Sequence, residues 1–140
     1  MTPEEIDAVL DRQTRAHLAH DIDAVLTLYA REAVHEFIGL PGGVIRGLPS
    51  IRQRCELMYR SMSGEEYRTL HRAYGTDFVA DELMVSATFT GTPWGLPGEG
   101  RQVSVRFLHT CEFRDGLILK ETSWVDAAAL VGQLLTTPEP

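Results

Sequence analysis

The N-terminal part of the chain carries side chains at helical spacing. Thr2 can cap a helix here, Pro3 suits its first position, and Glu5 completes a capping box with Thr2. The inner stripe of this helix consists of Ile6, Val9, Leu10, Gln13 and His17. The pattern therefore predicts an N-terminal helix whose inner side is apolar except for its last two members.

Two more helices are expected before the period changes. Asp21 can cap a short helix, and the segment VHEFIG after it is typical of a short strand. A third helix is expected to begin at Ser50, with Gln53 as its capping-box partner. Its buried stripe consists of Ile51, Cys55, Met58 and Met62. Its other side is expected to be solvated and carries Arg52, Arg54, Glu56 and Arg60.

From Tyr67 onward the apolar positions alternate, which is typical of strands. The strands are expected at 68–79, 83–92, 101–114 and 117–125, with turns at ADE, PWGLPGEG and RDG. A last helix is expected to begin at Asp126. Helices and strands are segregated along the chain, so the fold class is α+β. We expect one domain over residues 1–140, in which a curved antiparallel sheet packs on three helices and encloses a cone-shaped cavity.

The stretch VRFLHTCEF places a histidine in a row built to be buried. The row consists of Val103, Val105, Phe107, His109, Cys111 and Phe113. Asp115-Gly116 is a strong two-residue hairpin signal. Counting back from that turn sets His109 opposite Thr122, and turns Thr122, Trp124 and Asp126 into the cavity. A bulged turn would instead put Glu121 opposite His109.

Composition narrows the classes of function. The formal net charge is −7 at pH 7, with 20 acidic against 13 basic residues, so nucleic acid and anionic membranes are not expected partners. No apolar run is long enough for a membrane span, and MTPEEIDAVL is unlike a signal peptide, so a cytoplasmic location is expected. Cys55 and Cys111 are expected to be buried free thiols. No metal-ligand spacing, phosphate-binding loop or nucleophile elbow is present.

Several segments together resemble the nuclear transport factor 2-like superfamily, in particular its SnoaL-like polyketide cyclase branch. These segments are HDIDAVLTLYAREAVHEF, IRGLPSIRQRCELM, ELMVSATFTGTPWGLPGEGRQVSVRF and CEFRDGLILKETSWVDAAALVGQLL. The resemblance implies a cone-shaped α+β barrel, often dimeric, that works without metal or organic cofactor. It implies Asp126 as general acid/base and His109 as its assistant. Phe37 stands where steroid isomerases of the superfamily keep an Asp, and SATFTGT lacks the Arg-x-Asp of the epoxide hydrolases.

These observations favour an enzyme that moves protons on a hydrophobic, oxygen-bearing small molecule, by cyclisation, isomerisation or dehydration. The catalytic candidates are Asp126, His109, His71 and His35. The substrate-binding candidates are Trp124, Phe107, Phe37, Phe89, Gln13, His17, Thr122 and Trp94. The substrate is expected to be a polyketide, terpenoid or steroid-like ketone, and the protein a homodimer without cofactor or metal.

Each candidate also has a purely structural interpretation. Asp126 is placed to cap the last helix, and His109 could be a core histidine bonded to Thr122. Trp94 lies in a loop and fits either a lid over the cavity or a dimer contact. Two other functions stay open on the sequence alone: a module that binds a hydrophobic ligand without chemistry, and an interaction domain.

Overall fold

The computed structural model describes residues 1–136, and over these the chain forms four α-helices, one short 3-10 helix and six strands. The helices are α1 (Pro3–Leu18), α2 (Ile22–Leu26), α3 (Leu48–Ser61), η1 (Pro93–Gly95) and α4 (Ala127–Leu135). The strands are β1 (Tyr29–Ile38), β2 (Val44–Arg46), β3 (Met62–Gly75), β4 (Phe78–Phe89), β5 (Arg101–Arg114) and β6 (Leu117–Val125). The predicted α+β class is confirmed. No helix in this part of the chain has the length and apolarity to cross a bilayer.

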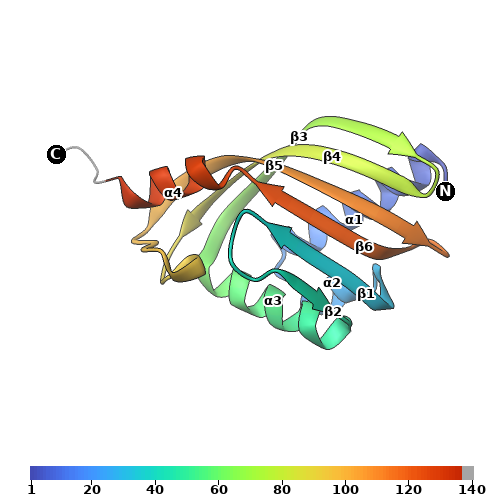
Figure 1. Ribbon diagram of the computed structural model, residues 1–140, viewed down its shortest axis with the longest axis horizontal. Coiled ribbons are helices and arrows are strands. Elements are labelled where there is room, and N and C mark those ends of the chain that lie inside the picture. The colour runs from blue at the N-terminus through green and yellow to red at the C-terminus, as the bar shows by residue number, and fades with distance from the viewer. Residues whose placement is uncertain (137–140) are drawn as a thin grey trace.

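One curved sheet has the strand order β2-β1-β6-β5-β4-β3 (Figure 1). The predicted meander of β3 to β6 is confirmed, because each of these strands pairs antiparallel with the next. The prediction of an antiparallel sheet is wrong at one place, since β1 runs parallel to β6. These two strands are joined through most of the chain and not by a hairpin, so no tight turn sets their direction.

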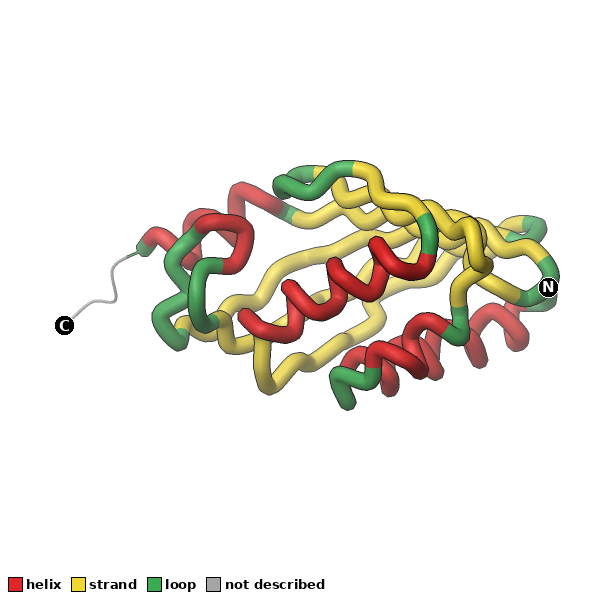
Figure 2. Tube along the Cα trace, turned by 90° about the horizontal axis from the view of Figure 1, so that it is seen from below, coloured by secondary structure: helices red, strands yellow, loops and turns green. Residues whose placement is uncertain are grey.

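The helices α1, α2 and α3 cover the concave face of the sheet, and α4 lies at one end (Figure 2). Two apolar clusters form there. One joins α1, α2 and α3 to the sheet through Ile6, Leu10, Val25, Ile51, Val79 and Ile118. The other joins α4 to β4 and β5 through Ala87, Phe89, Val103, Val105, Leu130 and Leu134. The space between the two clusters is where the cavity lies.

Helix starts follow the sequence signals except in α3. Thr2 Oγ1 accepts from Glu5 N at 3.2 Å, and Glu5 Oε2 accepts from Thr2 N at 2.8 Å, so the predicted capping box is confirmed. Asp21 caps α2 as predicted. The predicted start of α3 at Ser50 is wrong, because the helix begins at Leu48 after Gly47.

Strand boundaries differ more from the prediction. The first strand covers ten residues, and a second strand that was not predicted, β2, lies between it and α3. The turn expected at ADE lies instead between β3 and β4 at Thr76-Asp77, where Asp77 has a φ of +47°. Asp81 is therefore a residue of β4 and not part of a turn.

The register predicted for the last hairpin is wrong beyond its first two pairs. Arg114 pairs with Leu117 and Phe113 with Ile118, but a bulge leaves Leu119 without a partner. His109 consequently pairs with Ser123 and not with Thr122. One extra residue moves every later side chain of β6 to the other face. Glu121 now shares the face of His109, although its direct partner is Cys111.

The loop before β5 gives a test of this packing. Gly98 is buried, and a Cβ there would lie 2.7–2.8 Å from backbone atoms of Thr90. We expect Gly98→Ala to lower the free energy of unfolding by about 1–3 kcal/mol in urea denaturation, because the loop must shift. Gly132 is the matched control. It lies in α4 with nothing within 4 Å, so Gly132→Ala should raise stability by up to about 1 kcal/mol. Equal effects of the two substitutions would contradict this packing.

Candidate active site

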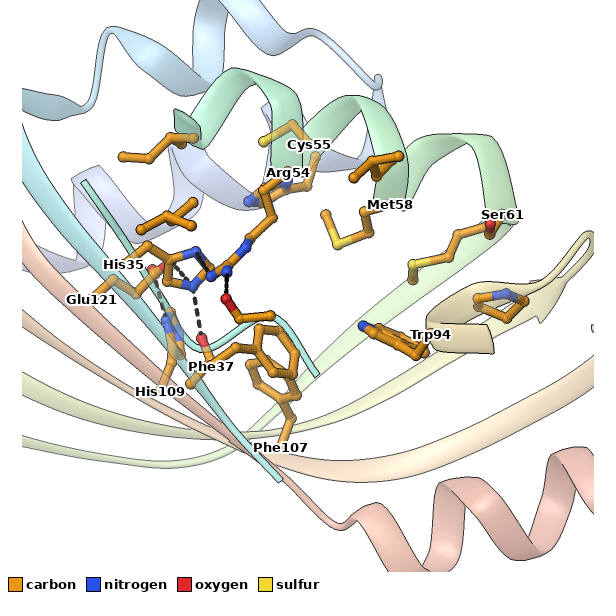
Figure 3. Close-up of a pocket in the computed structure, with 18 of the residues that line it drawn as sticks. His35, Phe37, Arg54, Cys55, Met58, Ser61, Trp94, Phe107, His109 and Glu121 are labelled. Atoms are coloured by element: carbon orange, nitrogen blue, oxygen red, sulfur yellow. Dashed lines mark hydrogen bonds and ion pairs between the residues drawn. The ribbon is translucent and has the colours of Figure 1, made fainter. Parts of the chain in front are cut away.

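A cavity of about 790 Å³ lies between the sheet and α1 and α3, and Figure 3 shows part of its lining. Most of its wall is apolar, which is usual for small-molecule sites. The apolar wall includes Leu10, Phe37, Ile45, Ile51, Met58, Met62, Leu83, Phe89, Trp94 and Phe107. Polar groups gather at the sheet end, where the side chains of His35, Glu121 and His109 point toward one another (Figure 3). The cavity is thus apolar except on its sheet side, where charged and polar side chains gather.

The structure brings most of the predicted site residues to this cavity. Those that line it are His109, His35, Phe107, Phe37, Phe89, Gln13, His17 and Trp94. Those that do not line it are Asp126, His71, Trp124 and Thr122. Trp94 approaches Phe37 and Phe89, with ring centroids 6.3 and 5.7 Å apart, so it contacts the aromatic wall of the cavity.

The residues outside the cavity are placed there by register and by capping. Thr122 pairs with Thr110, and Trp124 with Leu108, on the face opposite to His109. His71 is exposed and pairs with Glu82 on that same outer face. The exposed Asp126 accepts a hydrogen bond from Ala129 N at 3.1 Å and is the N-cap of α4. The bulge at Leu119 therefore removes Asp126 from the cavity that His109 lines, into which the predicted register had turned both side chains.

Five residues from five adjacent strands form what we call the polar row. They are His35, Glu121, His109, Asp81 and Arg72, on β1, β6, β5, β4 and β3 respectively. His35 pairs with Glu121 in the ladder, His109 with Asp81, and Asp81 with Arg72. Cross-strand partners share a face, so the ladder itself aligns these side chains on the concave side.

Glu121 is the centre of the row and is only 5% exposed. Its carboxylate accepts from Gln13 Nε2 at 2.8 Å, from the Tyr29 hydroxyl at 2.9 Å and from His109 Nδ1 at 3.1 Å. His35 Nε2 lies 3.4 Å from its Oε1. A buried carboxylate is stable only with such partners. Burial opposes ionisation and is the largest single effect, but the interactions with His109, His35 and Gln13 together outweigh it and hold the pKa of Glu121 well below its usual range.

His109 lies between two carboxylates. Its Nδ1 contacts Glu121, and its Nε2 lies 2.8 Å from Asp81 Oδ2. Burial disfavours the imidazolium, but the contacts with Cys111, Asp81 and Glu121 outweigh burial and hold the pKa of His109 well above its usual value. Both ring nitrogens donate in a histidinium, which matches an acceptor on each side. Arg72 completes the row with a hydrogen bond from Nε to Asp81 Oδ1 of 2.9 Å.

His35 has the opposite protonation. Arg54 NH1 lies 3.3 Å from His35 Nδ1, and a guanidinium can only donate, so Nδ1 is the acceptor and the proton is on Nε2. Nε2 faces Glu121 and Ser123 Oγ, the latter at 3.3 Å. Burial holds the pKa of His35 below its usual value; Glu121 opposes this effect and Arg54 adds to it. His35 is therefore a neutral base at neutral pH.

Two further polar groups of the cavity, His17 and Tyr29, are also neutral. Burial lowers the pKa of His17 to about 4, and His17 Nδ1 hydrogen-bonds to the Tyr59 hydroxyl at 2.5 Å. Burial raises the pKa of Tyr29 well above its usual value, so its phenol remains a donor to Glu121. Neutral donors and acceptors of this kind orient a ligand without adding charge to the chamber.

One group among the described residues has its ligand atoms close enough to share a metal ion. It consists of His109, Cys111 and Glu121, whose ligand atoms lie within 4.8 Å of one another. A metal requires a neutral imidazole and a thiolate. Burial raises the pKa of Cys111 to about 12, and His109 is protonated on both nitrogens. The three side chains are therefore better described as a hydrogen-bonded cluster than as a metal site.

Sequence reasoning missed several residues of the site. Tyr29 was not among the candidates, Arg54 was expected to be solvated, and Asp81 was expected to belong to a turn. Glu121 entered only through the bulged alternative. A signal for Asp81 exists, because Val79, Asp81 and Leu83 continue the inward alternation of β4. The signal for Arg54 is weak: Ile51 and Met58 lie three positions before and four positions after it on α3, but a charged residue on a helix is normally solvated.

The comparisons with known proteins agree with this architecture. Over residues 8–134 the sequence matches the family described as SnoaL-like polyketide cyclase. The chain belongs to this family. A search of curated proteins gives no match to this SnoaL-like chain. The family supports a cyclase-type, enzymatic role.

Solved structures show that this SnoaL-like chain shares its fold with bacterial proteins. A SnoaL-like protein from Jannaschia sp. CCS1 has a TM-score of 0.85 at 14% identity, covering 99% of this chain and 98% of the other. TsrD from Streptomyces laurentii has 0.84 at 18% identity, with 98% and 99% covered. A candidate polyketide cyclase from Xanthomonas campestris has 0.83 at 20% identity, with 94% and 97% covered. These matches confirm the fold.

The polar row predicts a large stability effect at its centre. Glu121→Gln removes one charge of a buried ion pair, and we expect it to lower the free energy of unfolding by about 3–5 kcal/mol in urea denaturation. The control is Glu112→Gln, which changes an exposed glutamate on β5 and should stay within about 0.5 kcal/mol of wild type. A Glu121→Gln protein as stable as wild type would show that the row does not hold the fold.

The cap at Asp126 predicts a different and smaller effect. Asp126→Ala should cost about 1 kcal/mol of stability, because the Ala129 amide loses its acceptor. Asp126→Asn keeps a good cap and should cost less. Neither substitution should change binding of a neutral aromatic ligand, measured by titration calorimetry. If both variants were as stable as wild type but failed to bind the ligand, Asp126 would have to be a residue of the binding site.

Proposed function

We propose that this chain is an acid/base enzyme, needing no cofactor, that moves protons on a hydrophobic, oxygen-bearing small molecule. The reaction class is cyclisation, isomerisation or dehydration, and the substrate class is a polyketide, terpenoid or steroid-like ketone. One observation carries the proposal. A neutral histidine, His35, lies in an apolar cavity with its Nε2–H directed at the buried carboxylate of Glu121.

In this arrangement the carboxylate of Glu121 orients His35 and prepares it to act as a base. Glu121 fixes the tautomer of His35, so that Nδ1 carries the lone pair. When Nδ1 takes a proton from a carbon next to a substrate carbonyl, the imidazolium formed is stabilised by the adjacent negative charge. The same proton can then return to another carbon or to an oxygen, which gives an isomerised, cyclised or dehydrated product.

His109 acts in this scheme through Glu121. Because His109 is held as an imidazolium by Asp81 and Glu121, it keeps Glu121 ionised without accepting a substrate proton itself. Phe37 and Phe107 form the wall beside the base, with ring centroids 6.0 Å apart, and suit a ring-bearing ligand. The role that the sequence suggested for Asp126 thus passes to His35, and His109 becomes a positioning residue.

The proposal predicts proton exchange at carbon. We expect the protein to accelerate exchange of the α-protons of 2-tetralone with deuterated water, followed by NMR. His35→Gln should slow the catalysed exchange by about 100-fold or more, because the base is lost. His71→Gln, a histidine on the outer face of the sheet, is the matched control and should exchange at the wild-type rate. An active His35→Gln protein would refute the assignment of the base.

The pH profile of this exchange has a defined direction. The lowered pKa of His35 means that the base is lost only below the ordinary histidine value of about 6.5, so the rate should be flat around neutrality and fall on the acid side. A rate that rises only above neutral pH would contradict a neutral His35. The absence of any exchange above a buffer blank, with the ketone still bound, would favour a binding module. Homodimerisation stays a prediction, which analytical ultracentrifugation can test.

A further inference from the structure

Arg54 is a half-buried cation at the cavity without an acidic counter-charge. Its hydrogen bonds go to Gly42 O at 2.7 Å, Gly43 O at 3.2 Å and His35 Nδ1 at 3.3 Å, all neutral acceptors. Among residues 1–136, no carboxylate is found in an ion pair with it. Arg52, two positions earlier, pairs with Asp23 instead. Arg54 therefore differs from Arg52: it faces the cavity, and its hydrogen-bond partners carry no negative charge.

The loop between β1 and β2 is shaped to receive this guanidinium. Gly42 has a φ of +129°, and a Cβ there would lie 3.2 Å from Arg54 NH2. Glycine is the residue that adopts such a conformation and permits such an approach. Two carbonyl oxygens then fix one side of the guanidinium, while His35 contacts another nitrogen. The cation is thus held in place at the cavity wall beside the proposed base (Figure 3).

Charges alternate along the polar row from Arg72 to Glu121, and Arg54 lies next to the row at its His35 end. Arg72 is positive, Asp81 negative, His109 positive and Glu121 negative, and His35 is neutral. Arg54 then adds a positive charge that the row does not balance. A cation partly removed from water is stabilised by an anion at hydrogen-bonding distance, and a planar guanidinium matches a planar carboxylate best.

We propose that Arg54 binds a carboxylate of the substrate, so that the ligand is a hydrophobic, ring-bearing acid whose reacting carbon lies near that carboxylate. The binding claim stands on the contacts of Arg54 alone, and the position of the reacting carbon rests on the proposed role of His35. A ligand oxygen, of a carboxylate or of a ketone, that accepts from Arg54 NH1 in place of His35 Nδ1 frees the lone pair of the proposed base.

The test compares an acid with its neutral isostere. Binding of 2-naphthoate and of 2-naphthamide to the full chain is measured by titration calorimetry at neutral pH. Wild type should prefer the acid by at least about tenfold, and Arg54→Met should lose this preference while binding the amide as before. Arg54→Lys keeps the positive charge but loses the planar guanidinium that can donate two hydrogen bonds to one carboxylate, so it should retain part of the preference for the acid. Arg52→Met, on the same helix, should behave as wild type.

The outcomes separate this proposal from the proposed function. Equal affinity of wild type for acid and amide, or an unchanged preference in Arg54→Met, overturns the carboxylate site. Unchanged amide binding by Arg54→Met shows that the variant is folded; if it binds neither compound, the comparison of Arg54→Lys with wild type decides. An acid preference together with no proton exchange supports the carboxylate site and refutes the catalytic role of His35.

Discussion

The buried carboxylate of Glu121 is the constraint on which the rest of the structure depends. Gln13 from α1, Tyr29 and His35 from β1, and His109 from β5 all meet it. A carboxylate in an apolar interior is tolerated only when its oxygens are satisfied, so each of these elements must arrive in register. The same contacts leave the cavity open above the row, since the polar groups bond to one another along the sheet.

Two histidines on either side of this carboxylate are held in opposite protonation states. His109 contacts acids through both ring nitrogens and stays charged, whereas His35 contacts an acid on one side and Arg54 on the other and stays neutral. Pairs of groups with pKa values driven apart are the usual basis for assigning acid and base roles. The fold of this SnoaL-like chain therefore separates a fixed charge from a proton acceptor within one short stretch of sheet.

The sequence allowed the fold and part of the site to be predicted, for identifiable reasons. The alternation from Val103 to Phe113 gave the inward face of β5, and with it His109. The bulge at Leu119 has no local signal, because it adds a residue without a Gly or Pro to mark it, and it reverses which side of β6 faces inward. Arg54 was missed because a charged residue on a helix is normally solvated, and only the contact with the Gly42 loop shows otherwise.

The most direct measurement is the protonation state of the histidine rings by long-range proton–nitrogen NMR at neutral pH. The signals would be assigned with His109→Gln and His35→Gln. Both ring nitrogens of His109 should carry protons, whereas His35 should carry a single proton, on Nε2. A neutral His109, or a His35 protonated on Nδ1, would contradict the claim that Glu121 organises the site.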